Sequence, residues 1–241
     1  MENTTPKTVV LVHGTFADGS GWEKVIPLLQ AEGLNVIAVQ NPLTSLADDV
    51  AAAGRAINSA PGEVVLVAHS WGGAVITQAG NNEKVKALVY VAAFAPSKDQ
   101  SVNDVLEGYP PPEWFSSAKM DSEGFLTLPL EAVSTYFAQD LPAAQTAIMA
   151  ATQGPVAAKS FGDKITEAAW SSRPSWYIVA ENDHMIWPDL EKAMAEKIGA
   201  TTTVLQSSHV PMLSQPKEVA NVILAAAGIS NNLAAAGTAN Q

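Results

Sequence analysis

The chain has 241 residues, 47% of them hydrophobic and 15% charged, and this size and composition predict one compact globular domain. Its formal net charge of −11 argues against binding to nucleic acids or to anionic membrane surfaces, because such a surface repels phosphates and acidic headgroups. The sequence contains no cysteine, which excludes disulfides, thiol nucleophiles and cysteine-ligated metal sites.

The amino-terminal residues lack the basic segment and apolar stretch of a secretory signal. No apolar run reaches the roughly 18 to 20 residues that a membrane-spanning helix needs. We therefore expect a cytoplasmic protein without membrane association.

Six short runs are apolar throughout and rich in β-branched residues, which is typical of strands buried on both faces of a parallel sheet. The runs are 8–12, 35–39, 64–68, 87–93, 175–180 and 202–205. Helical patterns follow them at about 22–31, 46–58, 71–81, 189–198 and 217–227. This alternation predicts an α/β fold with a mostly parallel sheet of about six strands, whose active site lies at the carboxyl ends of the strands.

The alternation fails once, between residues 96 and 170, where helical patterns at 130–139 and 143–152 appear with no strand between them. An insertion of this length at the carboxyl edge of a sheet predicts a helical lid, although a separate small helical domain is an alternative. We therefore divide the chain into an α/β core (1–95 and 171–228), a helical lid insertion (96–170) and a frayed tail (229–241).

The strongest motif surrounds Ser70, which stands where an apolar strand runs directly into a helix. Such an abrupt turn exposes the serine hydroxyl at the sheet edge and requires small residues two positions before and after it. Ala68 and Gly72 occupy those positions, so the motif departs from Gly-x-Ser-x-Gly only at its first glycine. Ser70 is therefore the candidate nucleophile.

A serine nucleophile needs a histidine base and a carboxylate that orients the histidine. Of the four histidines, His209 follows the last predicted strand and is the candidate base. Asp183 follows the preceding strand far enough to turn inward and is the candidate acid. Glu181, at the end of that strand, and Asp99, beyond the fourth strand, are the alternative acids.

The oxyanion of an acyl-transfer reaction is bound by two backbone N–H groups. The first is expected at Trp71, the residue after the nucleophile. The second is expected in the loop after the first strand, at Thr15 or, as an alternative, at Phe16.

The loop with His13-Gly14, the elbow His69-Ser70-Trp71-Gly72-Gly73 and the segments 177–183 and 209–216 together resemble the α/β-hydrolase superfamily. The similarity spans nearly the whole core and is nearest to the branch with small methyl esterases and hydroxynitrile lyases. The lyases carry threonine in place of Gly14 and lysine in place of Val210, so the resemblance implies ester hydrolysis. It also implies a fold with a Ser70–His209–Asp183 triad and no metal or cofactor.

The implied function is a serine carboxylesterase that cleaves an ester of a small hydrophobic or aryl substrate through an acyl-enzyme. The resemblance leaves open a ligand receptor on the same fold, and a cofactor-free haloperoxidase-like or lyase activity. Aromatic residues of the predicted lid are expected to face a pocket or the core, with a partner-binding surface as the alternative. They are Trp114, Phe115, Phe125, Phe137, Phe161 and Trp170.

Overall fold

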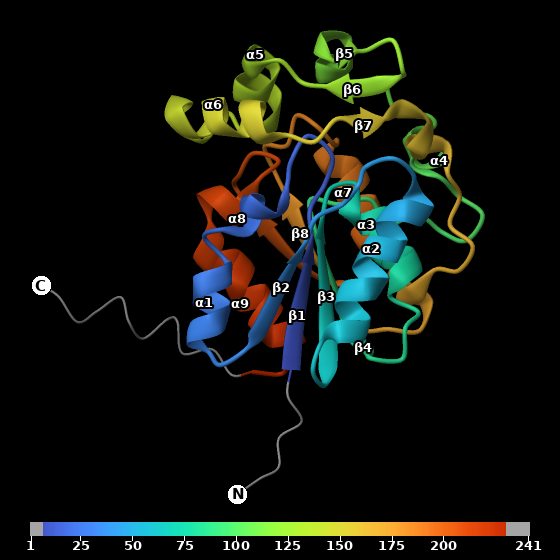
Figure 1. Ribbon diagram of the computed structural model, residues 1–241, viewed down its shortest axis with the longest axis vertical. Helices are drawn as coiled ribbons and strands as arrows, with labels where there is room; N and C mark the ends of the chain where they lie inside the picture. The colour runs from blue at the N-terminus through green and yellow to red at the C-terminus, as the bar shows by residue number, and fades with distance from the viewer. Residues whose placement is uncertain (1–6, 230–241) are drawn as a thin grey trace, which may run out of the picture.

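The computed structural model describes residues 7–229, and a six-stranded parallel sheet forms its centre (Figure 1). The predicted tail, 229–241, lies outside the described residues except for Ile229. The strands are β1 (Lys7–Val12), β2 (Asn35–Val39), β3 (Glu63–His69), β4 (Val85–Val91), β8 (Ser175–Ala180) and β9 (Thr201–Leu205). Their spatial order is β2-β1-β3-β4-β8-β9, which confirms the predicted α/β fold.

Burial follows the place of each strand in the sheet. The inner strands β1, β3, β4 and β8 are buried along almost their whole length, because helices cover both of their faces. The outer strands β2 and β9 are partly exposed, and β9 begins with the polar run Thr201-Thr202-Thr203. Threonine suits an edge strand because it combines β-propensity with a side chain that tolerates water.

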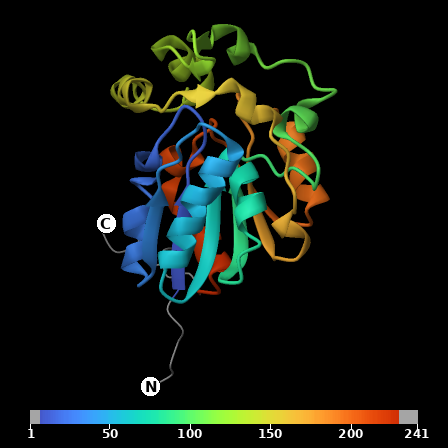
Figure 2. The same cartoon turned by 45° about the vertical axis from the view of Figure 1, so that its right-hand side comes forward.

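Helices α1 and α9 lie on one face of the sheet, and α2 and α3 cover the other (Figures 1 and 2). The helices outside the insertion are α1 (Ile26–Ala31), α2 (Leu46–Ser59), α3 (Gly72–Ala79), α7 (Pro188–Lys197), α8 (Pro211–Ser214) and α9 (Pro216–Ala226). The helix predicted over 22–31 starts later, because the chain first forms a 3-10 turn, η1 (Gly19–Trp22), capped by Asp18. Within residues 7–229, no helix has the length and apolar character needed to cross a membrane.

The segment from residue 96 to residue 170, called the insertion below, joins β4 to β8, and much of it lies above the carboxyl ends of the strands (Figures 1 and 2). Its helical elements include α4 (Val102–Leu106), α5 (Leu130–Ala132), a π-helical turn η3 (Val133–Phe137) and α6 (Ala143–Thr152). It also carries a small antiparallel sheet of β5 (Lys119–Met120), β6 (Phe125–Thr127) and β7 (Val156–Ala157).

The regular structure of the insertion is thus mostly helical, as expected, and it carries in addition three short strands that the sequence pattern did not indicate. Strands of two or three residues are too short to show an alternating pattern. β5 pairs with β6 across a short turn, and β6 pairs with the distant β7. Only α6 matches its predicted range, 143–152, whereas the predicted helix 130–139 divides into α5 and the π-helical turn η3.

Close contact at Gly73 fixes α3 against the end of β4. A Cβ atom added to Gly73 would lie 2.1 Å from the backbone oxygen of Phe94. Backbone oxygen atoms cannot move away as the end of a flexible side chain can. The helix that follows Ser70 is therefore packed against the strand at a distance that only glycine allows.

We predict that Gly73→Ala lowers the free energy of unfolding by about 3 kcal/mol, because overpacking against backbone forces the helix and strand apart. Gly54→Ala is the matched control, since Gly54 lies in α2 and a Cβ there meets no atom within 4 Å. Alanine at Gly54 should leave stability unchanged or raise it by about 0.5–1 kcal/mol. Urea denaturation measures both changes, and equal stability of the two variants would contradict the prediction.

Candidate active site

Ser70 stands at the turn between β3 and α3 with a backbone φ of +53°, in the left-handed region that non-glycine residues seldom occupy. Three backbone hydrogen bonds hold this conformation. The Ser70 amide donates to the oxygen of Val91 at 3.3 Å, and its own oxygen accepts from the amides of Gly73 and Phe94 at 2.9 and 3.1 Å. Strain that the surroundings enforce in this way is typical of functional sites.

Gly14, in the loop after β1, lies directly against this turn. A Cβ atom at Gly14 would lie 2.6 Å from the Cβ of Ser70 and 3.1 Å from Nδ1 of His69. This loop therefore approaches the nucleophile candidate more closely than any larger residue allows. A threonine at this position, as in the lyases of the resembling branch, does not fit the present backbone.

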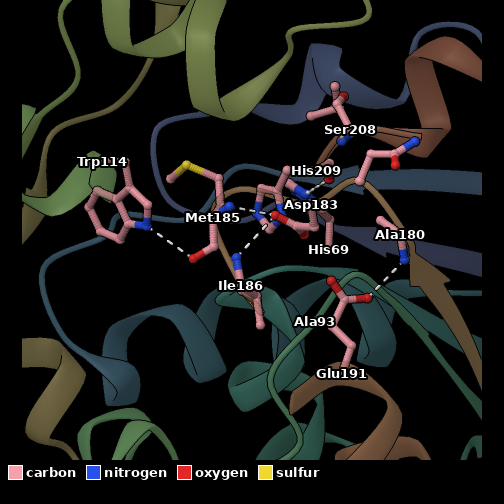
Figure 3. Close-up of polar contacts among 12 residues, drawn as sticks. His69, Ala93, Trp114, Ala180, Asp183, Met185, Ile186, Glu191, Ser208 and His209 are labelled. Carbon is pink, nitrogen blue, oxygen red and sulfur yellow. Dashed lines mark hydrogen bonds and ion pairs between the residues drawn. The ribbon is translucent and has the colours of Figure 1, made fainter. Parts of the chain in front are cut away.

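Asp183 and His209 form a buried hydrogen-bonded pair (Figure 3). Nδ1 of His209 donates to Oδ2 of Asp183 at 2.5 Å. Oδ1 of Asp183 accepts from the amides of Met185 and Ile186 at 2.6 and 3.0 Å, which fixes the carboxylate toward the histidine. The loops after β8 and β9 bring the two residues together, because both loops leave the same edge of the sheet.

The second ring nitrogen of His209, Nε2, is buried and has no hydrogen-bond partner among residues 7–229. His69, which precedes Ser70, donates from Nε2 to the carbonyl oxygen of His209 at 2.8 Å, and the two rings lie 4.5 Å apart between centroids. Burial holds the pKa of His69 well below its ordinary value, so its ring is neutral. No hydrogen bond joins Ser70 to His209 in the described structure, and such bonds are often long without a bound substrate.

The alternative acids lie away from this pair. Glu181 is partly exposed and forms an ion pair with Lys192 at 2.9 Å. Asp99 is exposed, and its amide donates to Ile165. The structure places neither carboxylate against His209.

Of the other histidines, His184 is exposed and His13 is occupied at both ring nitrogens. Nε2 of His13 accepts from the amide of Asn41 at 2.9 Å, and Nδ1 donates to the oxygen of Gly14 at 2.7 Å. Burial lowers the pKa of His13, which agrees with a neutral ring. His13 therefore shapes the loop after β1 and offers no nitrogen for proton transfer.

The expected oxyanion donors flank Ser70 from two sides. Trp71 follows it on the elbow, and Thr15 lies in the loop after β1, where both residues border the same cavity as Ser70. Among the described residues, neither the Thr15 nor the Trp71 amide donates to another backbone oxygen in a turn or loop. Phe16, the alternative donor, is buried and has a φ of +57°, which turns the loop sharply at this point.

Asp49 in α2 fixes the side chain of Trp71. Its Oδ2 accepts from the Trp71 indole N–H at 2.8 Å, and its Oδ1 accepts from the Leu43 amide at 2.7 Å. Asp49 is fully buried, and this burial raises its pKa. A single aspartate in a helical pattern gave no sequence signal for this role.

An apolar cavity opens at Ser70 beneath the insertion. Its polar lining consists of Thr15, Ser70 and Asn103, and none of its described lining residues is charged. The aromatic and aliphatic walls come from the core and from the insertion, and they include Phe16, Phe94, Leu106, Trp114, Phe161 and Ile186. Within residues 7–229, no group of three or more His, Asp and Glu residues is placed to hold a metal ion.

The insertion also contacts the neighbouring rings of His69 and His209. The ring of Phe137 lies edge-on to His209 and His69, at centroid distances of 5.2 and 6.0 Å. Asp140 accepts from the amide of Ser208, next to His209, at 2.8 Å. Phe137 and Trp114 are buried as expected for residues that face inward, whereas Phe115 is 59% exposed.

We predict that Trp71→Phe lowers the free energy of unfolding by about 1–3 kcal/mol, because it leaves a buried oxygen of Asp49 without its donor. The control is Trp187→Phe, since the indole of Trp187 donates to Pro110 in an exposed bond. That substitution should change stability by only about 0.5 kcal/mol. Similar losses in both variants, measured by urea denaturation, would count against the Asp49 contact.

Comparison with known proteins places the chain in a family. The chain is 28% identical to "Probable hydrolase R7" of a Phoma species, over 93% of this chain and 100% of that protein. It is 26% identical to Methylesterase 8 of Arabidopsis thaliana, over 90% of this chain and 88% of that protein. These names agree with the expectation that the chain is a carboxylic ester hydrolase and with its expected similarity to methyl esterases.

Solved structures share the fold. The pyrethroid hydrolase PytH superposes with a TM-score of 0.79 at 21% identity, covering 93% of this chain and 98% of that chain. Polyneuridine aldehyde esterase superposes with a TM-score of 0.77 at 22% identity, covering 91% and 98%. A family model described as "Alpha/beta hydrolase family" matches residues 9–222 of the sequence. The chain belongs to the alpha/beta hydrolase family.

Proposed function

We propose that the protein is a serine carboxylesterase that cleaves an ester of a small hydrophobic or aryl substrate. The observation that carries this proposal is the buried Asp183–His209 pair, whose imidazole lies against His69 next to the strained turn of Ser70. Ser70 itself lines an uncharged apolar cavity. The names of its relatives, which include hydrolases and methylesterases, support ester hydrolysis as the reaction.

In the proposed reaction, Oγ of Ser70 attacks the ester carbonyl carbon while its proton passes to Nε2 of His209. The carbonyl oxygen, on which negative charge develops, accepts hydrogen bonds from the amides of Thr15 and Trp71. His209 then gives the proton to the departing alcohol, which leaves an acyl group on Ser70. A water molecule, deprotonated by His209, attacks this acyl-enzyme and releases the acid and Ser70.

Asp183 has two roles in this scheme. Its hydrogen bond keeps the proton of neutral His209 on Nδ1, so that Nε2 is free to accept the serine proton. Its negative charge also stabilises the imidazolium that forms during each step.

The cavity favours neutral substrates. Its uncharged lining offers no cation for a carboxylate or phosphate, so an anionic group would lose its hydration without compensation. The insertion supplies Trp114 and Phe161 to this lining and is proposed to act as the lid that excludes water.

We predict that the parent protein turns over a p-nitrophenyl acyl ester many times and that Ser70→Ala lowers kcat by at least about 10⁴-fold. The release of p-nitrophenol measures both rates. Equal rates for the two proteins would contradict the mechanism. A single burst without turnover would instead favour a ligand receptor on this fold.

We further predict that Asp183→Asn lowers kcat/KM by about 10³–10⁴-fold, because asparagine neither holds the histidine tautomer nor stabilises the imidazolium. Glu181→Gln and Asp99→Asn are the controls, and both should retain activity within about twofold, since neither carboxylate contacts His209. If Glu181→Gln proved as damaging as Asp183→Asn, the assignment of the acid would be wrong.

A further inference from the structure

A second carboxyl group lies beside the candidate triad. Glu191 is the fourth residue of α7 and is completely buried, although glutamate rarely leaves water without a partner. Its Oε2 accepts from the amide of Ala180, the last residue of β8, at 2.9 Å (Figure 3). This bond places the carboxyl group at the strand end from which the Asp183 loop departs.

The other oxygen of Glu191, Oε1, accepts no hydrogen bond from any N–H or O–H donor in the described structure. Ala180 joins this carboxyl group to Asp183: its amide donates to Glu191, and its oxygen accepts from the Asp183 amide at 3.1 Å. The two side chains therefore leave neighbouring points of the same strand end, and the charge of Asp183 acts directly on Glu191. Two carboxylates placed in this way cannot both carry a negative charge in a buried site, so one of them keeps a proton.

The hydrogen bonds decide which group is ionised. Asp183 accepts from His209 and from two backbone amides, and three such donors stabilise a carboxylate. Glu191 accepts from a single amide. Burial, together with the negative charge of Asp183, raises the pKa of Glu191 well above its ordinary value.

No cation in the described structure offers Glu191 an alternative partner at hydrogen-bond distance. Lys192, its neighbour on α7, points to the surface and pairs with Glu181 at 2.9 Å. Tyr177 of β8 is buried, its hydroxyl donates to the oxygen of Ala93, and burial keeps its pKa well above the ordinary value. The groups that face Glu191 in the described structure are therefore neutral or negative.

We propose that Glu191 is a positioning residue of the catalytic site, a neutral carboxyl group whose Oε1–H donates a hydrogen bond to the carboxylate of Asp183. The role rests on the proposed function, because Glu191 acts on the reaction only through Asp183 and His209. The extra donor fixes the rotamer of Asp183 and draws part of its negative charge away from the histidine. Glu191 thus tunes how strongly Asp183 stabilises the imidazolium.

Two substitutions separate this role from simple packing. In Glu191→Gln, the amide oxygen can accept from Ala180 and the amide N–H can donate to Asp183, so kcat should stay within about threefold of the parent. Glu191→Met keeps the volume but removes the donor, and kcat should fall about tenfold or more with little change in KM. In Glu191→Met the full charge of Asp183 acts on His209, so the acid limb of kcat/KM against pH should move to higher pH.

Glu196→Met is the matched control, because Glu196 is an exposed glutamate on the same helix and should show parent activity and pH profile. A loss of activity in Glu191→Gln equal to that in Glu191→Met would overturn the proposal, since glutamine preserves the donor. Parent activity and an unmoved pH profile in Glu191→Met would also overturn it.

The proton on Glu191 can be tested without any activity. Folded parent keeps a proton that the unfolded chain releases above about pH 4.3, so its free energy of unfolding falls as pH rises from there toward the raised pKa of Glu191. Glu191→Gln has no such proton, and its stability relative to the parent should grow between pH 4 and pH 8. A constant difference across this range would show that Glu191 is ionised and would refute its role as a donor.

Infrared difference spectra give a second independent readout. At pH 7 the parent should show the carbonyl stretch of a protonated carboxyl group, and Glu191→Gln should lack it. If this band and the stability slope are present but no ester is cleaved, the proposed function fails while the protonated Glu191 stands. If esters are cleaved and the band is absent, the inference about Glu191 fails alone.

Discussion

The left-handed backbone of Ser70 persists only because its neighbours approach it at distances that leave no alternative. Gly14 reaches the side chain of Ser70 from the loop after β1, and Gly73 lets the following helix touch the backbone after β4. The hydrogen bonds from the amides of Gly73 and Phe94 to the backbone oxygen of Ser70 then fix the turn. Three neighbouring strands thus share in holding one unfavourable φ angle, and the position of every other candidate group follows from their parallel arrangement.

Parallel packing also explains why the candidate site is buried and yet polar. The loops after β1, β3, β8 and β9 all leave the same edge, so their polar side chains meet where the insertion covers them. Burial keeps His13 and His69 neutral, and each donates to a backbone oxygen. Asp183 accepts from His209 and from the amides of Met185 and Ile186, so oriented donors rather than water surround its carboxylate. Such an arrangement stabilises charge without reorganisation.

The insertion is joined to the core by specific contacts as well as by apolar packing. Asp140 binds the amide of Ser208, Trp114 donates to the oxygen of Met185, and Phe137 covers the two histidine rings. Movement of the insertion would therefore alter the loops that carry His209 and Asp183, in addition to opening the cavity. Trp114, which also lines the cavity, thus joins the cavity wall to the loop that carries Asp183.

The sequence by itself determined the core, because a strand covered on both faces must be apolar throughout and this pattern is visible without any tertiary information. It also placed Ser70, Asp183 and His209 each just beyond a strand, from the order of the motifs along the chain. Strand boundaries shifted by at most a few residues, as at β4, where apolar residues continue past the last ladder bond.

Only the tertiary structure decided which distant residues support these groups. Asp49, Asp140 and Glu191 lie in helical or loop segments whose patterns resemble those of ordinary surface residues. Their places near the site appear only as contacts to Trp71, Ser208 and Ala180. The strands of the insertion could not be predicted from the sequence either, because a strand of two or three residues shows no periodicity. Local patterns report what each segment buries, whereas the partner of a buried polar group depends on packing between segments far apart in the chain.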